Sequence, residues 1–518
     1  MQNYTLEAAA KRQNEIQESL KSQPQNFLLP VFHAFSPAGW CNDPNGFSFF
    51  GGKCHLFFQY HPYSTQWGPM HWGHLCTSDF VRWEILEPAL APDSDFDCEG
   101  CFSGTAIEFE DRHILAYTGV SKNKKGETLQ NQCLAEGDGL CYKKILQNPV
   151  ISAANVPFEF QKGDFRDSKL WREDGKFYMA CVLKMPDGKG SLVCFRSENL
   201  LDWKFVSVID KSSGKSGMWE CPDIFKLDGK DVVIFSPQEM KADFENGLHD
   251  GNNSVYMTGF LKRPEFIFER EMRTENSLNF AQIDGGIDFY APQTCLAPDG
   301  RRIMIAWMQN WESYITPQNY LWSGMMTFPR ELEFKNGKLF QNPVRELLLY
   351  RKKCECGVVS GTSSFIKNGF SHGDIELEFF SAFENSAECK NQDEKFSLML
   401  SRNVAGKKFS VEFTCDFAEQ TLCFDRRNSV EGGGKINFRK MKFPTSSFRN
   451  EKSAHGKRIS LRILIDVCSM EVFVNGGESA FTNAFFLIPD AFVSYENSAV
   501  LEMSVSENIR AEYKIFKI

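Results

Sequence analysis

The stretch "WECPDIFKLDGKDVVIF" (residues 219–235) contains one complete unit of the pattern that predicts the fold. Glu220 stands at its start, between a tryptophan and a cysteine, and an apolar run follows. Asp228-Gly229 then precedes a second apolar run, and an Asp-Gly pair between two such runs is typical of a β-hairpin. Because glutamate is normally solvated, its place at the mouth of a buried strand needs an explanation.

Similar hairpin signals recur along the first two thirds of the chain, roughly 55 to 70 residues apart. Each turn-forming pair is followed at once by an apolar strand; the pairs are Gly51-Gly52, Glu110-Asp111, Asp174-Gly175, Asp228-Gly229 and Asp299-Gly300. "TSDFVRWE" (77–84) and "SENLLDWK" (197–204) also resemble each other and form a second repeat signal. Units of this size predict a β-propeller of five four-stranded blades. The alternative is an irregular β-sandwich in which the hairpins recur by chance.

Polar residues occupy equivalent places about eight residues before each turn. They are Asp43, Ser103, Asp167, Glu220 and Asp288. In a propeller, one strand of every blade lines the central channel. If these stretches begin that strand, their side chains converge on one mouth of the channel. Glu220 is then one of several carboxylates that pseudo-symmetry brings together.

Paired carboxyl groups are the usual equipment for cleaving a glycosidic bond, one as nucleophile or base and the other as acid. Crowding raises one pKa and leaves the other group ionised, which separates their roles. Asp43, Asp167 and Glu220 are the candidates. Taken singly, Asp43 is more typical of a structural turn and Asp167 of a local ion pair, whereas Glu220 fits a strand edge no better than a catalytic position; their recurrence at one phase of the repeat favours catalysis. Asp288 is interpreted as a structural or supporting residue.

The composition is that of a globular protein of 518 residues, long enough for two domains. A net charge of -9 without a long basic run argues against nucleic-acid or anionic-membrane partners. The 17 cysteines show no regular spacing, so a reducing compartment is expected. The close pairs Cys98/Cys101 and Cys354/Cys356 are interpreted as reduced thiols, and no metal or cofactor is predicted. Oligomeric state is left open.

Residues 1–30 are expected to form an N-terminal extension with a short amphipathic helix that ends near Pro24. Its apolar face would contain Leu6, Ala9, Ile16 and Leu20. No apolar run resembles a signal-peptide core or a membrane span, so a cytoplasmic location is expected.

The motifs "WCNDPNG" (40–46), "FRDSK" (165–169) and "WECPD" (219–223) resemble the three signatures of glycoside hydrolase family 32. That family includes invertases, sucrose-6-phosphate hydrolases and fructanases. The resemblance covers nearly the whole chain after about Pro30, including "LRILIDVCSMEVFVNGGE" (461–478) near the end. It implies a five-bladed propeller followed by a β-sandwich, and cleavage with retention through a covalent fructosyl intermediate.

By match of motif, the resemblance implies that Asp43 is the nucleophile, Glu220 the acid/base and Asp167 a stabiliser of the transition state. Substrate-binding positions of the family fall on Asn42, Gln59, Trp67, Phe102, Ser103, Arg166 and Trp307. Two residues depart from the family: Cys41 stands where a larger apolar residue is usual, and Ser168 replaces a proline. Since residues i and i+2 of a strand share a face, Cys41 is expected to border the funnel beside Asp43, and Cys221 to point away. The alternative is that the turn at Pro44 rotates Cys41 inward, where it fills the space of the usual larger residue.

Alternating apolar and polar stretches such as "GDIELEFF" and "KKFSVEFT" predict half-buried strands in the last third of the chain. The expected organisation is a propeller over residues 31–345 and a β-sandwich over 346–518. The leading hypothesis is a retaining β-fructofuranosidase acting on sucrose or sucrose 6-phosphate, without a cofactor. The alternatives are an exo-acting hydrolase of fructans or fructo-oligosaccharides, a fructosyltransferase, and a carbohydrate-binding propeller without activity.

Overall fold

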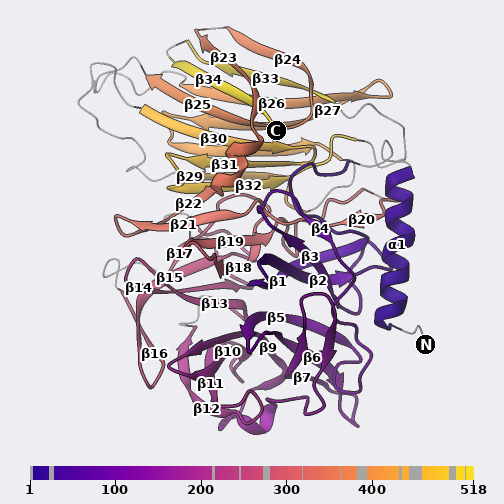
Figure 1. Cartoon of the computed structure of the whole chain (residues 1–518). Coiled ribbons are helices and arrows are strands. Elements are labelled where there is room, and N and C mark those ends of the chain that lie inside the picture. The colour runs from indigo at the N-terminus through magenta and orange to yellow at the C-terminus, as the bar shows by residue number, and fades with distance from the viewer. Residues whose placement is uncertain are drawn as a thin grey trace.

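The computed structural model describes residues 4–22, 28–212, 216–243, 247–271, 280–317, 319–361, 363–381, 394–430, 435–442, 458–488, 498–507 and 509–518. Nearly all of the regular structure is β, and the strands divide into a group before residue 344 and a group after residue 351 (Figure 1). The first group forms four-strand meanders that lie below the two sheets of the second group in this view.

The first sheet has the order β20-β1-β2-β3-β4. Its strands are β1 (Gly39–Phe50), β2 (Lys53–His61), β3 (His71–Thr77), β4 (Glu84–Ile85) and β20 (Trp322–Ser323), which pairs with β1 in parallel. The next sheet has the order β12-β11-β10-β9-β5-β6-β7-β8. Its strands are β5 (Gly100–Phe109), β6 (Arg112–Lys122), β7 (Thr128–Gly137), β8 (Tyr142–Lys144), β9 (Gln161–Glu173), β10 (Lys176–Lys184), β11 (Gly190–Ser197) and β12 (Lys204–Lys211), with the 3-10 helix η2 (Ala153–Asn155) between β8 and β9.

The third sheet has the order β13-β14-β15-β16, and the fourth β18-β19-β21-β22. The strands of the third are β13 (Trp219–Leu227), β14 (Lys230–Pro237), β15 (Val255–Lys262) and β16 (Ile267–Arg270), with β17 (Ala281–Gln282) also paired to β15. Those of the fourth are β18 (Tyr290–Leu296), β19 (Arg302–Trp307), β21 (Arg330–Lys335) and β22 (Lys338–Pro343).

The predicted hairpin turns lie between the first two strands of each meander. At four of these turns, both residues of the predicted pair have positive φ, as a two-residue hairpin of type I′ requires. In the last turn only Gly300 does, because a longer loop joins β18 to β19. The two similar segments 77–84 and 197–204 also share a backbone feature, since Phe80 (φ 60) and Leu200 (φ 67) both adopt the left-handed conformation.

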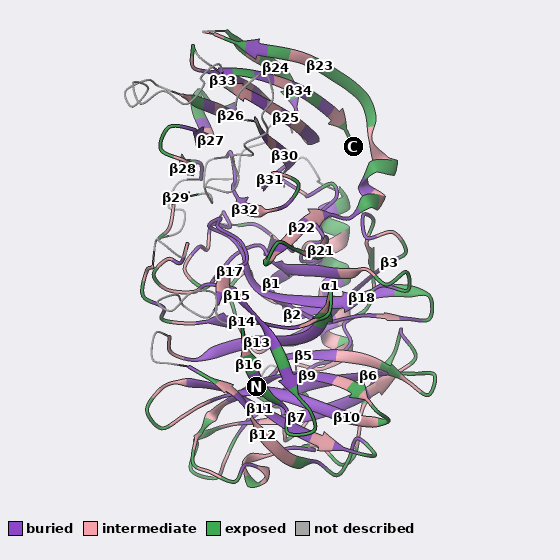
Figure 2. Ribbon diagram, turned by 90° about the vertical axis from the view of Figure 1, so that its left-hand side faces the viewer, coloured by how far each residue is buried: buried purple, intermediate pink, exposed green. Residues whose placement is uncertain are grey.

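The strands β1, β5, β9, β13 and β18 are here called the inner strands. They contact one another in cyclic order, β1 with β5, β5 with β9, β9 with β13, β13 with β18, and β18 with β1. Figure 2 shows their long buried stretches. Side chains join them: Thr105 Oγ of β5 donates to Ser168 O of β9 (2.9 Å), and Gln293 Nε2 of β18 donates to Gly104 O of β5 (2.8 Å).

The strands after residue 351 form, within the described ranges, two sheets of six strands each. One has the order β23-β34-β25-β30-β31-β32, with β23 (Lys352–Ser360), β34 (Ile509–Lys517), β25 (Gly373–Ser381), β30 (Arg458–Asp466), β31 (Ser469–Val474) and β32 (Ser479–Ala484). The other has the order β24-β33-β26-β27-β28-β29, with β24 (Ser364–Phe370), β33 (Ala499–Val505), β26 (Lys395–Val404), β27 (Lys407–Asp416), β28 (Thr421–Asn428) and β29 (Phe438–Lys442). Apolar residues of both sheets share one buried cluster, and the 3-10 helix η4 (Arg345–Tyr350) precedes β23.

The N-terminal helix α1 (Leu6–Ser22) lies along the side of the first group of strands (Figure 1). It buries Ala9, Ile16 and Leu20, as the sequence predicts, but Leu6 is only half-buried. Gln13 completes the buried face instead, and its Nε2 donates to Leu86 O (2.9 Å). A polar residue can occupy this face because its amide has a backbone partner.

A buried ionic cluster joins the two groups of strands. His33 lies just before β1; its Nδ1 is 2.8 Å from Asp466 Oδ2 and its Nε2 is 2.8 Å from Glu471 Oε1, with all three side chains fully buried. Asp466 also accepts the backbone N–H groups of Val31 (2.9 Å) and Phe32 (3.1 Å). Arg330 of β21 binds Glu471 and, at 2.9 Å, Asp284. The second group of strands therefore holds the segments that flank the inner strands.

Candidate active site

Every inner strand has a bulge with one extra residue relative to its hairpin partner; in β1, β5, β9 and β13 this bulge lies at a predicted site residue, whereas in β18 it begins at Tyr290, two residues after Asp288. The register shifts lie between Cys41 and Pro44 in β1, Phe102 and Gly104 in β5, Arg166 and Lys169 in β9, Glu220 and Asp223 in β13, and Tyr290 and Gln293 in β18. A bulge of this kind redirects side chains and is common beside active sites. Asp167 (φ 60), Cys221 (φ 48) and Ala291 (φ 51) adopt left-handed conformations at these bulges.

Asp43 is buried, and its two oxygens have different surroundings. Oδ2 accepts hydrogen bonds from Ser103 Oγ (2.8 Å) and from the thiol of Cys221 (3.4 Å). Oδ1 is buried and has no hydrogen-bond partner among the described residues. One oxygen therefore orients the carboxylate while the other remains available to an electrophile.

Asp167 lies against the same thiol. Its Oδ2 accepts the backbone N–H of Cys221 (2.9 Å) and is 3.7 Å from the sulfur. Its own N–H donates to Thr118 Oγ1 (3.0 Å), which stabilises the left-handed backbone at this residue. Cys221 thus connects the carboxylates of Asp43 and Asp167.

Glu220 is held on both sides. Arg166 donates to Oε1 from Nε (3.2 Å) and Nη2 (3.0 Å), and the Tyr290 hydroxyl donates to Oε2 (2.7 Å). Arg166 also donates to Asp164 Oδ1 (2.8 Å). The structure therefore brings Asp43, Asp167, Glu220, Ser103 and Arg166 into one connected group.

Burial and mutual repulsion dominate the electrostatics of this group. Burial, reinforced by the charge of Glu220, raises the pKa of Asp43, and the donors Ser103 and Cys221 partly oppose this. Burial also raises the pKa of Asp167 to about 7; Arg166 acts against the rise, and Glu220 and Asp43 add to it. Burial acts to lower the pKa of Arg166, but Glu220 and Asp167 outweigh it, so the pKa is raised and the residue stays a cation. Crowded carboxyl groups beside one cation are suited to divide the roles of acid and base.

The other predicted residues surround this group. Gln59 Nε2 donates to Cys101 O (3.0 Å), and Asn42 Oδ1 accepts from Trp40 Nε1 (2.7 Å). Trp67 is half exposed and meets Phe102 edge to face at 6.1 Å. Trp307 is fully buried, packs edge to face against Trp40 (5.8 Å), and its Nε1 has no partner among the described residues.

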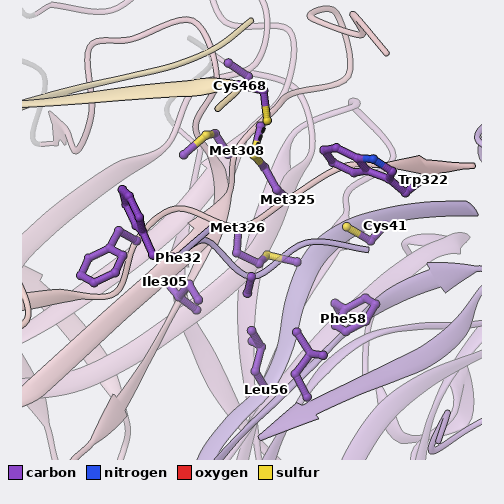
Figure 3. Close-up of a cluster of buried hydrophobic side chains, with 14 of the residues drawn as sticks. Phe32, Cys41, Leu56, Phe58, Ile305, Met308, Trp322, Met325, Met326 and Cys468 are labelled. Atoms are coloured by element: carbon purple, nitrogen blue, oxygen red, sulfur yellow. Dashed lines mark hydrogen bonds between the residues drawn. The ribbon is translucent and has the colours of Figure 1, made fainter. Parts of the chain in front are cut away.

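The expected orientations of Cys41 and Cys221 are wrong. Cys41 is buried in the apolar cluster that contains Phe58 and Trp322 (Figure 3), and its sulfur packs against Gly324. Cys221 faces the carboxylates instead. The alternation rule fails because Cys221 lies in a bulge with positive φ, so it and Glu220 both contribute to the site.

Asp288 does not join the carboxylate group. Its Oδ2 accepts hydrogen bonds from Arg426 Nη1 (2.7 Å) and from the N–H of Ala484 (2.8 Å), so it connects the segment just before β18 to the second group of strands, in line with a structural interpretation. Tyr290, which the sequence analysis missed, occupies this place in the site. A signal was present, because proline inside a strand commonly marks a bulge, and Pro44, Pro222 and Pro292 all lie at the register shifts.

In the described part of the chain, no group of three or more His, Cys, Asp or Glu side chains is arranged to hold a metal ion. Nor does any described helix have the length and apolar character to cross a bilayer. The described cysteines are all free thiols.

Comparisons with known proteins agree over nearly the whole chain. Residues 33–343 match the glycosyl hydrolases family 32 N-terminal domain, and residues 350–515 match the glycosyl hydrolases family 32 C terminal. The chain is 33% identical to a sucrose-6-phosphate hydrolase of Escherichia coli, with 90% of this chain and 91% of that protein covered. It is 32% identical to a raffinose invertase of Escherichia coli, with 90% and 92% covered. Among solved structures, a β-fructofuranosidase of Bombyx mori superposes with a TM-score of 0.79 at 28% identity, covering 99% of this chain and 98% of that one.

Proposed function

Because the chain belongs to glycosyl hydrolase family 32, we propose that it hydrolyses the β-fructofuranosidic bond of sucrose or sucrose 6-phosphate, with retention of configuration. The observation that carries the proposal is the buried group of Asp43, Asp167 and Glu220, in which Asp43 Oδ1 has no hydrogen-bond partner among the described residues. A sucrose-6-phosphate hydrolase and a raffinose invertase among the relatives support the substrate class.

Asp43 acts as the nucleophile in this proposal. Its Oδ1 attacks the anomeric carbon of fructose while Ser103 and Cys221 hold Oδ2. Glu220 protonates the leaving oxygen and then, as a base, activates the water that releases fructose. Arg166 and Tyr290 hold the Glu220 carboxyl group in place through both of its oxygens.

Asp167 accepts hydrogen bonds from fructose hydroxyls and stabilises the positive charge that develops on the sugar. The thiol of Cys221 lies between Asp167 and Asp43, so it holds the two carboxylates at a fixed position relative to each other during the reaction. Gln59, Asn42 and Trp307 bound the fructose, and Trp67 with Phe102 forms an aromatic edge for the leaving sugar.

The proposal includes the architecture behind this site. Residues 31–345 form a five-bladed propeller, residues 346–518 a β-sandwich, and residues 1–30 an N-terminal extension. The cyclic contacts of the inner strands, the meanders that follow each of them, and the ranges of the two family matches support this division. A cytoplasmic location remains a prediction from the sequence.

The test compares the specificity constants for sucrose, sucrose 6-phosphate and a short inulin series. Release of fructose from either disaccharide with a higher constant than from inulin supports the proposal. A higher constant for inulin identifies a fructan hydrolase, and preferential formation of longer sugars at high sucrose identifies a transferase. No fructose release from any of these substrates would leave a carbohydrate-binding protein and refute the enzyme assignment.

A further inference from the structure

A further aromatic surface lies beside the active site, in the segment that follows β19. Trp311 is its exposed member, with 38% of its surface accessible, whereas Trp307, four residues earlier, is fully buried. Trp307 pairs across the β18–β19 hairpin with Tyr290, whose hydroxyl donates to Glu220 Oε2. Trp311 therefore lies on the solvent side of a residue that already borders the carboxylate group.

Buried rings hold the indole of Trp311 in place. It meets Trp307 edge to face, with 5.2 Å between the ring centroids, and lies nearly parallel to Trp40 (6.5 Å, 18°). The ring of Tyr314 is also nearly parallel to Trp40 (5.9 Å, 20°). Trp40 Nε1 in turn donates to the side chain of Asn42, the residue before the proposed nucleophile. The aromatic group is thus anchored on the catalytic motif itself.

Hydrogen bonds also fix the backbone on both sides of Trp311. Asn310 is buried, and its Nδ2 donates to Ile287 O (2.7 Å). Its Oδ1 accepts the N–H of Glu312 (2.8 Å), and its own N–H donates to Ser313 Oγ (2.9 Å). Because the segment is already ordered, a ligand that contacts Trp311 loses little affinity to the ordering of this loop.

The segment is joined directly to the neighbour of Trp67, the other exposed tryptophan near the site. Gln66 Nε2 donates to the Tyr314 hydroxyl (2.8 Å), which donates to Thr65 O (3.3 Å). Trp67 is half exposed, so an exposed indole lies close in sequence to each partner of the Gln66–Tyr314 hydrogen bond. Aromatic surface that is exposed next to convergent polar groups is characteristic of small-molecule sites. Trp67 and Trp311 therefore belong to one rim around the carboxylate group.

We infer that Trp311 is a specificity-determining residue, whose indole packs against the pyranose ring of the leaving sugar. This role rests on the proposed function, in which fructose lies next to Asp43 and Trp307. The leaving sugar then projects towards solvent, where Trp311 is the next ring after Trp307. Contact removes both the indole and the C–H face of the pyranose from water, which is favourable. Sucrose, whose leaving group is glucose, gains this contact, and a fructoside of a small alcohol does not.

Steady-state kinetics of the full chain on sucrose and on methyl β-D-fructofuranoside test this role. Trp311→Ala should lower kcat/KM for sucrose by about tenfold, mainly through a higher KM, because the contact is present in both the ground state and the transition state. The kcat/KM for methyl β-D-fructofuranoside, whose leaving group is methanol, should not change. Trp311→Phe keeps an aromatic ring and should retain most of the sucrose activity.

Phe260→Ala is the matched control, since Phe260 is an aromatic residue of β15 that is 58% exposed and lies in the β15–β16 hairpin, away from the inner strands. It should leave the kinetics on both substrates unchanged, and thermal unfolding should show that all three variants are folded. Equal losses of Trp311→Ala on the two substrates, or a loss on neither, would overturn the role of Trp311 while fructose release by the wild type upholds the proposed function. If the wild type releases fructose from neither substrate, the proposed function fails and the role of Trp311 fails with it.

Discussion

Replacing His33 with glutamine should destabilise the protein in a way that depends on pH. Burial acts to lower the pKa of His33, but Asp466 and Glu471 outweigh it and raise the pKa to about 9 from an ordinary value of 6.5. The folded state therefore binds the His33 proton more tightly than the unfolded state does. This contribution is fully present below pH 6.5 and is lost as the pH rises through about 9. A shift of this size corresponds to about 3 kcal/mol.

At pH 6.5, His33→Gln should lower the free energy of unfolding by about 3 to 5 kcal/mol, because Asp466 and Glu471 are left buried without their cation. The difference in free energy of unfolding between wild type and variant should then shrink steadily towards pH 9, where about half of the folded wild type has lost the His33 proton. Differential scanning calorimetry at intervals across this range measures the gap, and contributions common to both proteins cancel.

His113→Gln is the matched control. His113 is equally buried and uses both ring nitrogens, towards Ser48 Oγ (2.9 Å) and Tyr142 OH (2.8 Å), but burial lowers its pKa to about 3. His113 is neutral in the folded state throughout this pH range. The difference in free energy of unfolding between His113→Gln and wild type should therefore be nearly constant above pH 7.5. If the His33→Gln gap is constant or widens between pH 6.5 and 9, the charged cluster does not stabilise the junction as described.

The remaining predictions concern the active site. Asp43→Ala and Glu220→Ala should each slow sucrose hydrolysis by about three orders of magnitude or more without unfolding the protein. Azide should partly restore the activity of Glu220→Ala on a substrate whose leaving group is activated. An Asp43→Ala enzyme that keeps a tenth of the wild-type activity contradicts the assignment. Early NMR spectra should show β-fructofuranose first, whereas initial release of the α anomer would exclude double displacement. Cys221→Ala should move the acidic limb of the pH profile of kcat/KM to higher pH, because the thiol hydrogen bond lowers the pKa of Asp43. Cys221→Ser keeps a hydrogen-bond donor and should move this limb less. Cys41→Ser changes a thiol that faces away from the carboxylates and should leave the limb where it is.

Local patterns in the sequence predict the hairpins and the phase of the site residues. Pairs such as Asp228-Gly229 have few alternatives to a tight turn, and recurrence places Asp43, Asp167 and Glu220 at one end of successive units. The orientation of neighbouring side chains within those motifs cannot be predicted in this way, because a single inserted residue reverses which side chains face the site. Cys41 and Cys221 exchange their expected places for this reason.

Contacts between distant segments are beyond a reading of local pattern. Nothing in the sequence around Asp288 or His33 identifies Arg426 or Asp466 as a partner, since each pair is brought together by packing between sheets. Tyr290 was missed for a related reason: its role depends on Glu220 reaching across from another inner strand.

The contact of Asp466 with the segment before β1 has a consequence for how the protein is made. Val31 and Asp466 are separated by 435 positions, and a ribosome releases the N-terminal partner first. At a synthesis rate of 5 to 20 residues per second, the amide groups of Val31 and Phe32 wait about 20 to 90 seconds for their acceptor. Until Asp466 is made, the leading edge of β1 lacks this carboxylate, and until residues 322–323 are made it also lacks its parallel neighbour β20, so it is open to pairing with another nascent chain. The yield of correctly folded protein during translation should therefore depend on protection of this edge, and slow codons before residue 466 would prolong its exposure.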